Sequence, residues 1–206
     1  MVYKTEQESF WASDFGNDYI IRNDDKKLIS SNIHFLSNAL KRCSKIENCI
    51  EFGSNIGNNL VALKYLLPEV DLNAIEINKN AIKKLREIMP EKNIYNESIL
   101  EFNTEKTFDL VLIKGVLIHL NPAYLRQVYS KLVKCCSKYL LLCEYYNPTP
   151  VSINYRGHED KLFKRDFAGE LLDNHSEMFL VDYGFLYRKD PIFPGSDTTW
   201  FLLKKS

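Results

Sequence analysis

The sequence predicts a doubly wound α/β domain whose mostly parallel sheet ends in an antiparallel hairpin. Four short apolar runs are nearly continuous rather than alternating, which is typical of strands covered by helices on both faces. Strands that alternate with helices form an open sheet with right-handed crossovers. Two further strands near the C-terminus follow one another without a helix, so they must pair antiparallel. The four runs are 49–52, 72–77, 108–113 and 139–145, and the terminal strands are 179–188 and 198–204.

Helical patterns separate the strands, and the first helix is expected near the N-terminus. Thr5 followed by Glu8 fits a capping box, which places the start of a short helix there. The aromatic residues that follow either pack this helix on the domain or form a lid over a ligand cleft. In a lid, the polar residues Tyr19, Arg22 and Asn23 would face the ligand. Later helices are expected at 58–67, 80–89, 122–137 and 162–173, with a weak strand at 93–99 and a Pro/Gly-rich loop at 190–197.

The composition indicates one globular domain. The 206 residues suffice for one compact domain but not for two full-sized ones. We therefore expect a single domain over 1–206, with an N-terminal helical lid or cap (1–45) and a Rossmann-like core (46–206). Basic and acidic residues balance at 27 each, so no global field attracts nucleic acid.

The same composition bears on location. No run approaches the roughly 20 apolar residues that span a bilayer, and the polar N-terminus does not fit a secretion signal. The five cysteines include no Cys-x-x-Cys pair, which favours free thiols in a reducing compartment. We expect a cytoplasmic protein with no membrane partner.

A glycine-containing turn between the first strand and its helix carries the clearest chemical signal. It reads Glu51-x-Gly53-x-Asn55-x-Gly57; the glycines permit a sharp turn, and the helix N-terminus offers free N–H groups. Glu76 ends the second strand 19 residues after Gly57, close to the spacing at which a carboxylate reaches ribose hydroxyls. Together these features predict a nucleoside-binding site.

The residue at position 55 decides which nucleoside is favoured. A dinucleotide pyrophosphate needs a glycine there so that the backbone can come close. Asn55 would crowd a diphosphate but is tolerable beside a methionyl tail. No Gly-Lys-Ser/Thr follows the turn, which excludes a P-loop. We therefore predict S-adenosylmethionine as the cofactor, in preference to NAD, and no metal.

The next strand ends supply further candidates, because ligands of open α/β sheets bind outside the carboxyl ends of the strands. His119 follows the fourth strand and is either a general base or a structural histidine that caps the turn at Asn121. The expected cofactor-binding residues are Trp11, Tyr19, Arg22, Glu51, Gly53, Asn55, Gly57, Glu76, Ile77, Ser98, Ile99, Lys114, Gly115 and Leu117.

The segment after the fifth strand is the expected acceptor site. Arg156 could clamp a carboxylate or phosphate, although the loop could instead pack its own aromatic side chains. Methyl transfer needs mainly alignment in a dry site, so a base matters only where the acceptor must lose a proton. The expected catalytic residues are His119, Tyr145 and His158, and the expected substrate-binding residues are Tyr146, Asn147, Tyr155, Arg156 and Arg165.

Motifs along nearly the whole chain resemble one family, the pseudaminic acid biosynthesis-associated methylases, within the class I S-adenosylmethionine-dependent methyltransferases. The resemblance implies a seven-stranded, mostly parallel sheet with a C-terminal antiparallel hairpin and helices on both faces. It also implies a bacterial cytoplasmic enzyme encoded among nonulosonic acid or surface-glycan genes. The motifs are TEQESFW (5–11), FGNDY (15–19), EYYNP (144–148), YRGH (155–158), KLFKRDFAGE (161–170), VDYGF (181–185) and DTTWF (197–201).

Three functions fit these observations. The leading one is a methyltransferase that acts on an amino or hydroxyl group of a small sugar or sugar precursor. A second keeps the cofactor but methylates an asparagine or arginine side chain of a peptide or protein. The third is a non-catalytic module that only binds S-adenosylmethionine, against which the complete set Glu51, Gly53, Gly57 and Glu76 argues.

Overall fold

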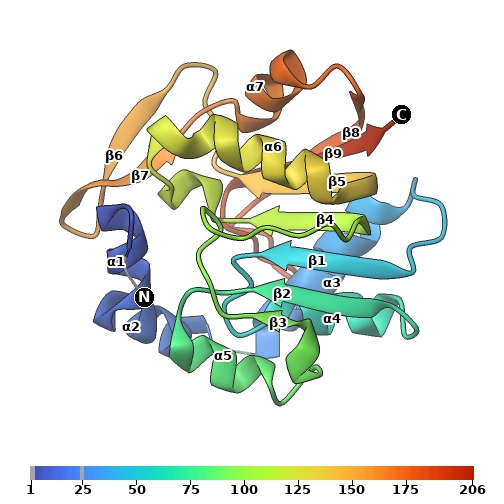
Figure 1. Ribbon diagram of the computed structural model, residues 1–206, viewed down its shortest axis with the longest axis horizontal. Coiled ribbons are helices and arrows are strands. Elements are labelled where there is room, and N and C mark those ends of the chain that lie inside the picture. The colour runs from blue at the N-terminus through green and yellow to red at the C-terminus, as the bar shows by residue number, and fades with distance from the viewer. Residues whose placement is uncertain (1–2, 24–25) are drawn as a thin grey trace.

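A seven-stranded sheet forms the centre of the computed structural model, which describes residues 3–23 and 26–206 (Figure 1). Its strands are β1 (Asn48–Phe52), β2 (Asp71–Ile75), β3 (Ile94–Tyr95), β4 (Phe108–Lys114), β5 (Cys136–Glu144), β8 (Met178–Leu186) and β9 (Thr198–Lys205). The order across the sheet is β3-β2-β1-β4-β5-β9-β8. Neighbours from β3 to β5 are parallel, whereas β9 is antiparallel to both β5 and β8. The predicted fold class is confirmed.

Helices cover both faces of the sheet, and each face has its own apolar core. In β4, Leu110 and Leu112 belong to one core and Val111 and Ile113 to the other, because successive strand side chains point to opposite faces. This burial on both faces explains the continuous apolar runs of the sequence. Residues of α3 (Lys26–Leu40), α4 (Asn58–Leu66) and α5 (Lys79–Leu85) pack in one core, and those of α6 (Leu125–Cys135) and α7 (Phe167–Asn174) in the other.

The N-terminal segment forms two short helices, α1 (Glu6–Ala12) and α2 (Asp14–Asn23). The predicted capping box is confirmed: the N–H of Glu8 donates to Oγ1 of Thr5 at 3.2 Å, and the Glu8 carboxylate accepts from the N–H of Thr5 at 3.0 Å. Both helices lie beyond the arrowheads of β1 and β2, at the carboxyl ends of the parallel strands (Figure 1). They therefore lie at the edge of the sheet where ligands of such folds bind.

Residues 151–164 form a separate hairpin that local sequence patterns did not predict. Strands β6 (Val151–Tyr155) and β7 (His158–Lys164) pair antiparallel, with Arg156 and Gly157 at the turn in left-handed conformations, φ 53° and 87°. The segment expected to be a loop at 155–158 is therefore the tip of this hairpin. It extends from the body of the domain toward α1 (Figure 1).

The predicted helix over 162–173 is wrong in its first part. Leu162 and Phe163 are buried residues of β7 that pair with Ile153 and Ser152 of β6, a cross-strand contact that helical spacing does not reveal. Helix α7 begins only after Asp166, whose carboxylate accepts from the N–H of Gly169 at 2.8 Å. The other boundaries differ less: β3 has two residues rather than seven, and β5 starts at 136, where a helix was expected to continue.

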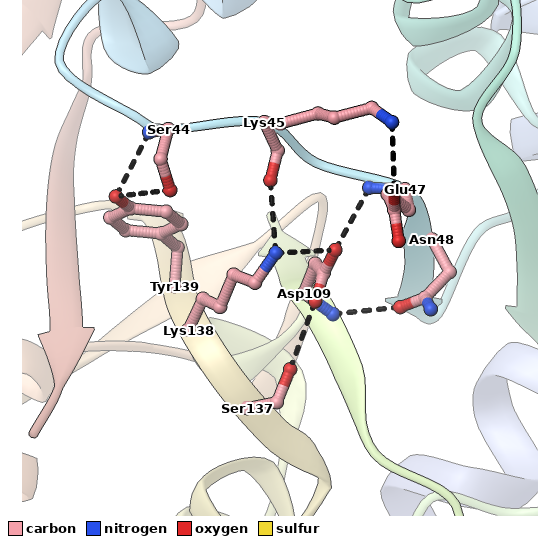
Figure 2. Close-up of polar contacts among 8 residues, drawn as sticks. All are labelled: Ser44, Lys45, Glu47, Asn48, Asp109, Ser137, Lys138 and Tyr139. Carbon is pink, nitrogen blue, oxygen red and sulfur yellow. Dashed lines mark hydrogen bonds and ion pairs between the residues drawn. The ribbon is translucent and has the colours of Figure 1, made fainter.

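A polar network around Asp109 joins the amino ends of three strands, away from the ligand edge (Figure 2). The Asp109 carboxylate accepts from the N–H of Glu47 at 2.9 Å and from Nζ of Lys138 at 3.0 Å. Its own N–H donates to Oδ1 of Asn48 at 2.7 Å. Because Asn48 starts β1, Asp109 lies in β4 and Lys138 lies in β5, the network fixes the order β1-β4-β5.

Two expectations about composition can be compared with the structure. All five cysteines are free thiols, as predicted, and Cys49, Cys135, Cys136 and Cys143 are buried. Among the described residues, no helix is long and apolar enough to cross a membrane.

Candidate cofactor and acceptor site

A cavity of about 220 Å³ lies at the carboxyl ends of β1, β2 and β4. The strand ends and the turns after them form one wall, and α1 and α2 contribute side chains to the opposite one. The N-terminal helices therefore contribute to the cavity wall at the ligand edge of the sheet.

Glu76 lies on the cavity wall directly after β2 and is 8% exposed. Its Oε2 accepts from the N–H of Asn55 and its Oε1 from the N–H of Asn78, both at 2.7 Å. Burial raises the pKa of this carboxyl, and the backbone donors partly offset that effect. Each oxygen retains a further lone pair, so the carboxylate can also accept hydrogen bonds from two hydroxyls of a ribose.

Glu51 lies beneath the glycine turn, 1% exposed. Its Oε1 accepts from Nδ2 of Asn59 at 2.6 Å, whereas its Oε2 is buried without a partner among the described residues. Burial raises the pKa of Glu51 to about 8, although the Asn59 hydrogen bond and the nearby charge of Lys114 lower it. A buried carboxylate oxygen without a donor is costly, so this oxygen is a candidate partner for a ligand ammonium group.

The side chain of Glu144 stabilises the turn after β4 through hydrogen bonds to its backbone. Its Oε1 accepts from the N–H groups of Val116 and Leu117, both at 3.0 Å, and burial raises its pKa to about 7. The turn carries Gly115 on the cavity wall with φ 67°. A Cβ at this position would meet no atom within 4 Å, so the backbone faces open space that a ligand can occupy.

Helix α1 is tied to the turn after β3. The Glu8 carboxylate accepts from Oγ of Ser98 and also from the N–H groups of Lys4 and Thr5. Ser98 and Ile99 line the cavity together with Ile77, which follows β2. This end of the cavity therefore combines apolar faces with the polar Glu8–Ser98 pair.

His119 lines the far side of the cavity and is 7% exposed. Its Nδ1 lies 2.6 Å from the carbonyl oxygen of Lys161. Because a carbonyl can only accept, Nδ1 carries the proton and Nε2 keeps a free lone pair. Burial lowers the pKa of His119 to about 4, so the ring is neutral near pH 7. The rings of Trp11 and Tyr155 flank it at centroid distances of 4.5 and 5.0 Å.

The structure brings most of the predicted cofactor residues together on the cavity wall. The exceptions are Glu51 and Leu117, which are buried behind it, Gly57, which caps α4, and Arg22, which is exposed on α2 with its guanidinium over the ring of Phe15. The predicted residues that line the cavity are Trp11, Tyr19, Gly53, Asn55, Glu76, Ile77, Ser98, Ile99, Lys114, Gly115 and His119.

The predicted acceptor residues are dispersed instead. Tyr146 and Arg165 meet in a β-bridge beside α7, where Arg165 pairs with Glu170 at 2.7 Å. Arg156 is exposed at the tip of the β6–β7 hairpin, and Asn147 donates to the carbonyl of Thr149.

The other predicted proton acceptors also lie off the cavity wall. His158 contacts the rings of Phe10 and Phe15 at 5.0 and 5.8 Å, and Lys164 covers the ring of Tyr145 at 5.0 Å. Tyr155, predicted to bind the substrate, reaches the site through its ring contacts with His119 and Trp11.

Several cavity residues were missed by sequence reasoning. Gln7 and Glu8 line the wall from α1, yet the sequence marked Glu8 only as part of a capping box. Asn32 receives a hydrogen bond from Nζ of Lys114 at 2.9 Å, and Asn59 joins Lys114 to Glu51. Gln7 could have been predicted, because it lies four residues before Trp11 and so on the same helical face. Asn32 and Asn59 could not, because no sequence pattern around them indicates a ligand site.

Together these features fit S-adenosylmethionine. Glu76 can hold a ribose, the unpartnered Oε2 of Glu51 can receive an ammonium group, and the open space at Gly115, after the next strand β4, leaves further room for the ligand. Among the described residues, no cluster of three or more His, Cys, Asp and Glu side chains could hold a metal ion.

Comparisons with known proteins agree with this assignment. Residues 50–138 match the family model described as "Methyltransferase domain". No curated protein matches the chain. The fold is similar to that of 1,6-didemethyltoxoflavin-N1-methyltransferase from Burkholderia thailandensis, solved with 1,6-didemethyltoxoflavin and S-adenosylhomocysteine (16% identity, 100% of this chain and 92% of that chain, TM-score 0.72).

Two further solved structures share the fold. One is N-methyltransferase NodS from Bradyrhizobium japonicum (17% identity, 88% of this chain and 98% of that chain, TM-score 0.65). The other is magnesium protoporphyrin IX methyltransferase from Synechocystis with bound S-adenosylmethionine (13% identity, 100% of each chain, TM-score 0.66). Residues 50–138 therefore form a methyltransferase domain, the chain has the class I fold of these enzymes, and the residues around the cavity fit S-adenosylmethionine.

Proposed function

We propose that this methyltransferase acts on a hydroxyl or amino group of a small, sugar-like acceptor that binds beside His119. The observation that carries the proposal is the attachment of the N-terminal helices on both sides of the cavity. On the hairpin side, Nε2 of Gln7 donates to the carbonyl of Asp160 at 2.9 Å. On the sheet side, Nδ2 of Asn78 donates to the carbonyl of Trp11 at 3.3 Å and to Oδ1 of Asn17 at 3.1 Å. A cavity enclosed in this way favours a small acceptor over a side chain of a folded protein.

The cofactor supplies a methyl group on a positively charged sulfur. Our proposed roles follow from the chemistry of the residues at the cavity: Glu76 on the wall accepts from the ribose hydroxyls, and Glu51, buried behind the wall, offers its unpartnered Oε2 to the ammonium group. Ile77 and Ile99 cover the adenine faces. Enclosure by α1 and α2 would keep water from the reacting atoms, which helps because the reaction depends mainly on alignment.

His119 would take a proton from a hydroxyl acceptor. Its neutral ring and free Nε2 suit this role, because a hydroxyl must lose its proton when it becomes an ether. A neutral amine already has a lone pair and would need the base only after methyl transfer.

The family resemblance supports a nonulosonic acid or surface-glycan precursor as the acceptor. The motifs on which it depends include α1, which lines the cavity, and the β6–β7 hairpin, which accepts a hydrogen bond from Gln7 of α1. The five free cysteines support the cytoplasmic location that the resemblance implies.

A transfer assay with methyl-labelled S-adenosylmethionine tests this function. The enzyme would be incubated with small-molecule and protein fractions of its host, and excess S-adenosylhomocysteine would serve as the inhibited control. We expect label in the small-molecule fraction, on oxygen or nitrogen. Label confined to protein would overturn the sugar proposal in favour of a peptide side chain, and cofactor binding without any transfer would favour a non-catalytic module.

A further inference from the structure

Two buried polar atoms on α1 have no hydrogen-bond partner among the described residues. They are Oε1 of Gln7, a side chain that is 6% exposed, and Nε1 of Trp11. Both residues line the cavity, and their i, i+4 spacing places them on the same face of the helix. His119 packs against Trp11 and adds the free lone pair of its Nε2. This part of the wall therefore has two hydrogen-bond acceptors, Oε1 of Gln7 and Nε2 of His119, and one donor, Nε1 of Trp11, for which the described residues show no partner.

A bulge in β7 holds these groups in place. Ile153 pairs with Leu162 and Tyr155 with His158, so a step of two residues along β6 faces a step of four along β7. Within this bulge, Asp160 has φ 52°. The carbonyl of Asp160 receives Nε2 of Gln7, and the next carbonyl, that of Lys161, receives Nδ1 of His119. In a regular strand successive carbonyls point in opposite directions. The bulge breaks this alternation, so the carbonyls of Asp160 and Lys161 can both accept hydrogen bonds from residues of the same cavity wall.

The amide orientation of Gln7 follows from the same contact. A carbonyl accepts only, so the nitrogen of the Gln7 amide must face Asp160 and the oxygen must face away from it. The bulge thus leaves Oε1 of Gln7 and Nε2 of His119 as hydrogen-bond acceptors, while Nε1 of Trp11 can only donate.

The wall formed by these three residues carries no free charge. The Lys161 ammonium pairs with Glu6 at 3.2 Å, and the Glu8 carboxylate is bonded to Ser98 and to two backbone N–H groups. The charged residues Glu76, Lys114 and Glu97 lie on or beside the ends of β2, β4 and β3, on the sheet wall. An anionic or cationic group would find no counter-charge beside Gln7, Trp11 and His119, and its desolvation would be uncompensated.

We propose that Gln7, Trp11 and His119 form the acceptor subsite, and that it binds an uncharged part of the acceptor through hydroxyl groups. A hydroxyl both donates and accepts, so neighbouring hydroxyls can satisfy two acceptors and one donor together. This inference rests on the proposed function and specifies it: the methylated group is an oxygen, and the acceptor is neutral where it contacts α1.

Methyl transfer from S-adenosylmethionine to the acceptor hydroxyl needs no further reagent. The acceptor oxygen forms a bond to the methyl carbon as the carbon–sulfur bond breaks, and the bonding electron pair stays on sulfur. The hydroxyl proton passes to Nε2 of His119. The products are a methyl ether, neutral S-adenosylhomocysteine and an imidazolium that returns its proton to water.

Calorimetry on the full chain saturated with S-adenosylhomocysteine tests the subsite. The probes are methyl glucoside (neutral), glucuronate (anionic) and glucosamine (cationic). We expect the neutral probe to bind best. Gln7→Met and Trp11→Phe should each weaken its binding about tenfold, the effect of one lost hydrogen bond to a buried group. Trp11→Phe leaves the Asp160 contact of Gln7 intact, so it separates ligand binding from support of the fold.

Gln127→Met is the matched control, because its amide donates to the carbonyl of Leu100 and lies outside the cavity wall. It should leave probe binding unchanged. Preferred binding of glucosamine or glucuronate, or no binding of methyl glucoside while S-adenosylhomocysteine stays bound, would overturn the subsite. Neither result would contradict the proposed function. That function fails only if the transfer assay shows no labelled methyl group on any small molecule.

Discussion

The backbone N–H of Asn55 donates to the carboxylate of Glu76 at 2.7 Å and so joins the glycine turn to the end of β2. Asn55 has φ 47°, a left-handed conformation that asparagine tolerates better than most residues. The two sequence features that predicted a nucleoside site are therefore one unit, in which the turn orients the acid.

Replacing Glu76 with alanine should remove the contacts to the ribose. We expect the affinity for S-adenosylhomocysteine, measured by calorimetry, to fall at least about tenfold, because a charged acceptor of hydrogen bonds is lost. Glu69→Ala is the control, because Glu69 is exposed and lies just before the first residue of β2, at the end of the strand away from Glu76. Equal affinity of Glu76→Ala and the wild type would contradict the placement of the ribose.

The pH dependence of stability should report the burial of Glu51. Its pKa is about 8 in the folded protein and about 4.3 in an unfolded chain. Between these values the folded state keeps a proton that the unfolded state has lost, so the free energy of unfolding falls as pH rises. Glu51→Gln cannot titrate and should lose less stability than the wild type between about pH 5 and 8.

Urea denaturation of the cofactor-free protein measures this difference. Glu144, with a pKa of about 7, also makes the free energy of unfolding fall as pH rises. The Glu51→Gln variant should therefore still lose some stability over this pH range. Glu47→Gln provides the control, because Glu47 is exposed and Lys45 lowers its pKa through a hydrogen bond. Parallel curves for Glu51→Gln and the wild type would show that Glu51 is not protonated in the folded state.

The pH profile of methyl transfer should reveal the state of His119. Its pKa is about 4, so the ring stays neutral well below the ordinary histidine range. With a hydroxyl acceptor, kcat/KM should remain flat on the acid side down to about pH 5 and fall only below it. An acid limb near pH 6.5 would contradict this assignment.

Variants separate His119 from the remaining histidines. His119→Gln should lower kcat about a hundredfold, the lower end of the usual effect of a general base. His34→Gln is the matched control, because His34 stacks on Phe193 at 4.4 Å and does not line the cavity. Its profile should superimpose on that of the wild type.

The network around Asp109 should contribute to stability rather than to activity. Burial acts to raise the pKa of Asp109, but the Glu47 N–H and the Lys138 ammonium outweigh it, and the pKa is lowered. Asp109→Ala leaves these donors without their acceptor and should cost about 1–3 kcal/mol in urea denaturation. Glu105→Ala, which breaks an exposed pair with Lys134, should cost at most about 1 kcal/mol.

The stabilising effect of Asp109 has a defined pH range. A lowered folded-state pKa stabilises the protein above the unfolded value of about 3.9, and this contribution is lost as pH falls further. The stability gap between the wild type and Asp109→Ala should therefore be constant near pH 7 and narrow below about pH 4. A gap that does not change with pH would mean that the carboxylate charge plays no part.

The sequence by itself determined the central sheet and the cofactor wall. Runs such as 108–113 are apolar at every position because both faces of β4 are buried, and this property is local. Glu51, Gly53, Asn55 and Glu76 could be found for the same reason. The end of a strand and the turn after it are adjacent in sequence, and parallel strands place all such ends at one edge.

Only the tertiary structure brought together the residues of the proposed acceptor subsite. Residues 162–164 have a helical spacing but join β7, because Leu162 and Phe163 gain burial against β6 and outweigh local preference. The sequence predicted substrate binding by residues 146, 147, 155, 156 and 165, whereas the structure holds Gln7 and His119 through consecutive carbonyls of a bulge. These contacts join residues 153 and 42 positions apart, and no local pattern encodes a hydrogen bond to a distant backbone carbonyl.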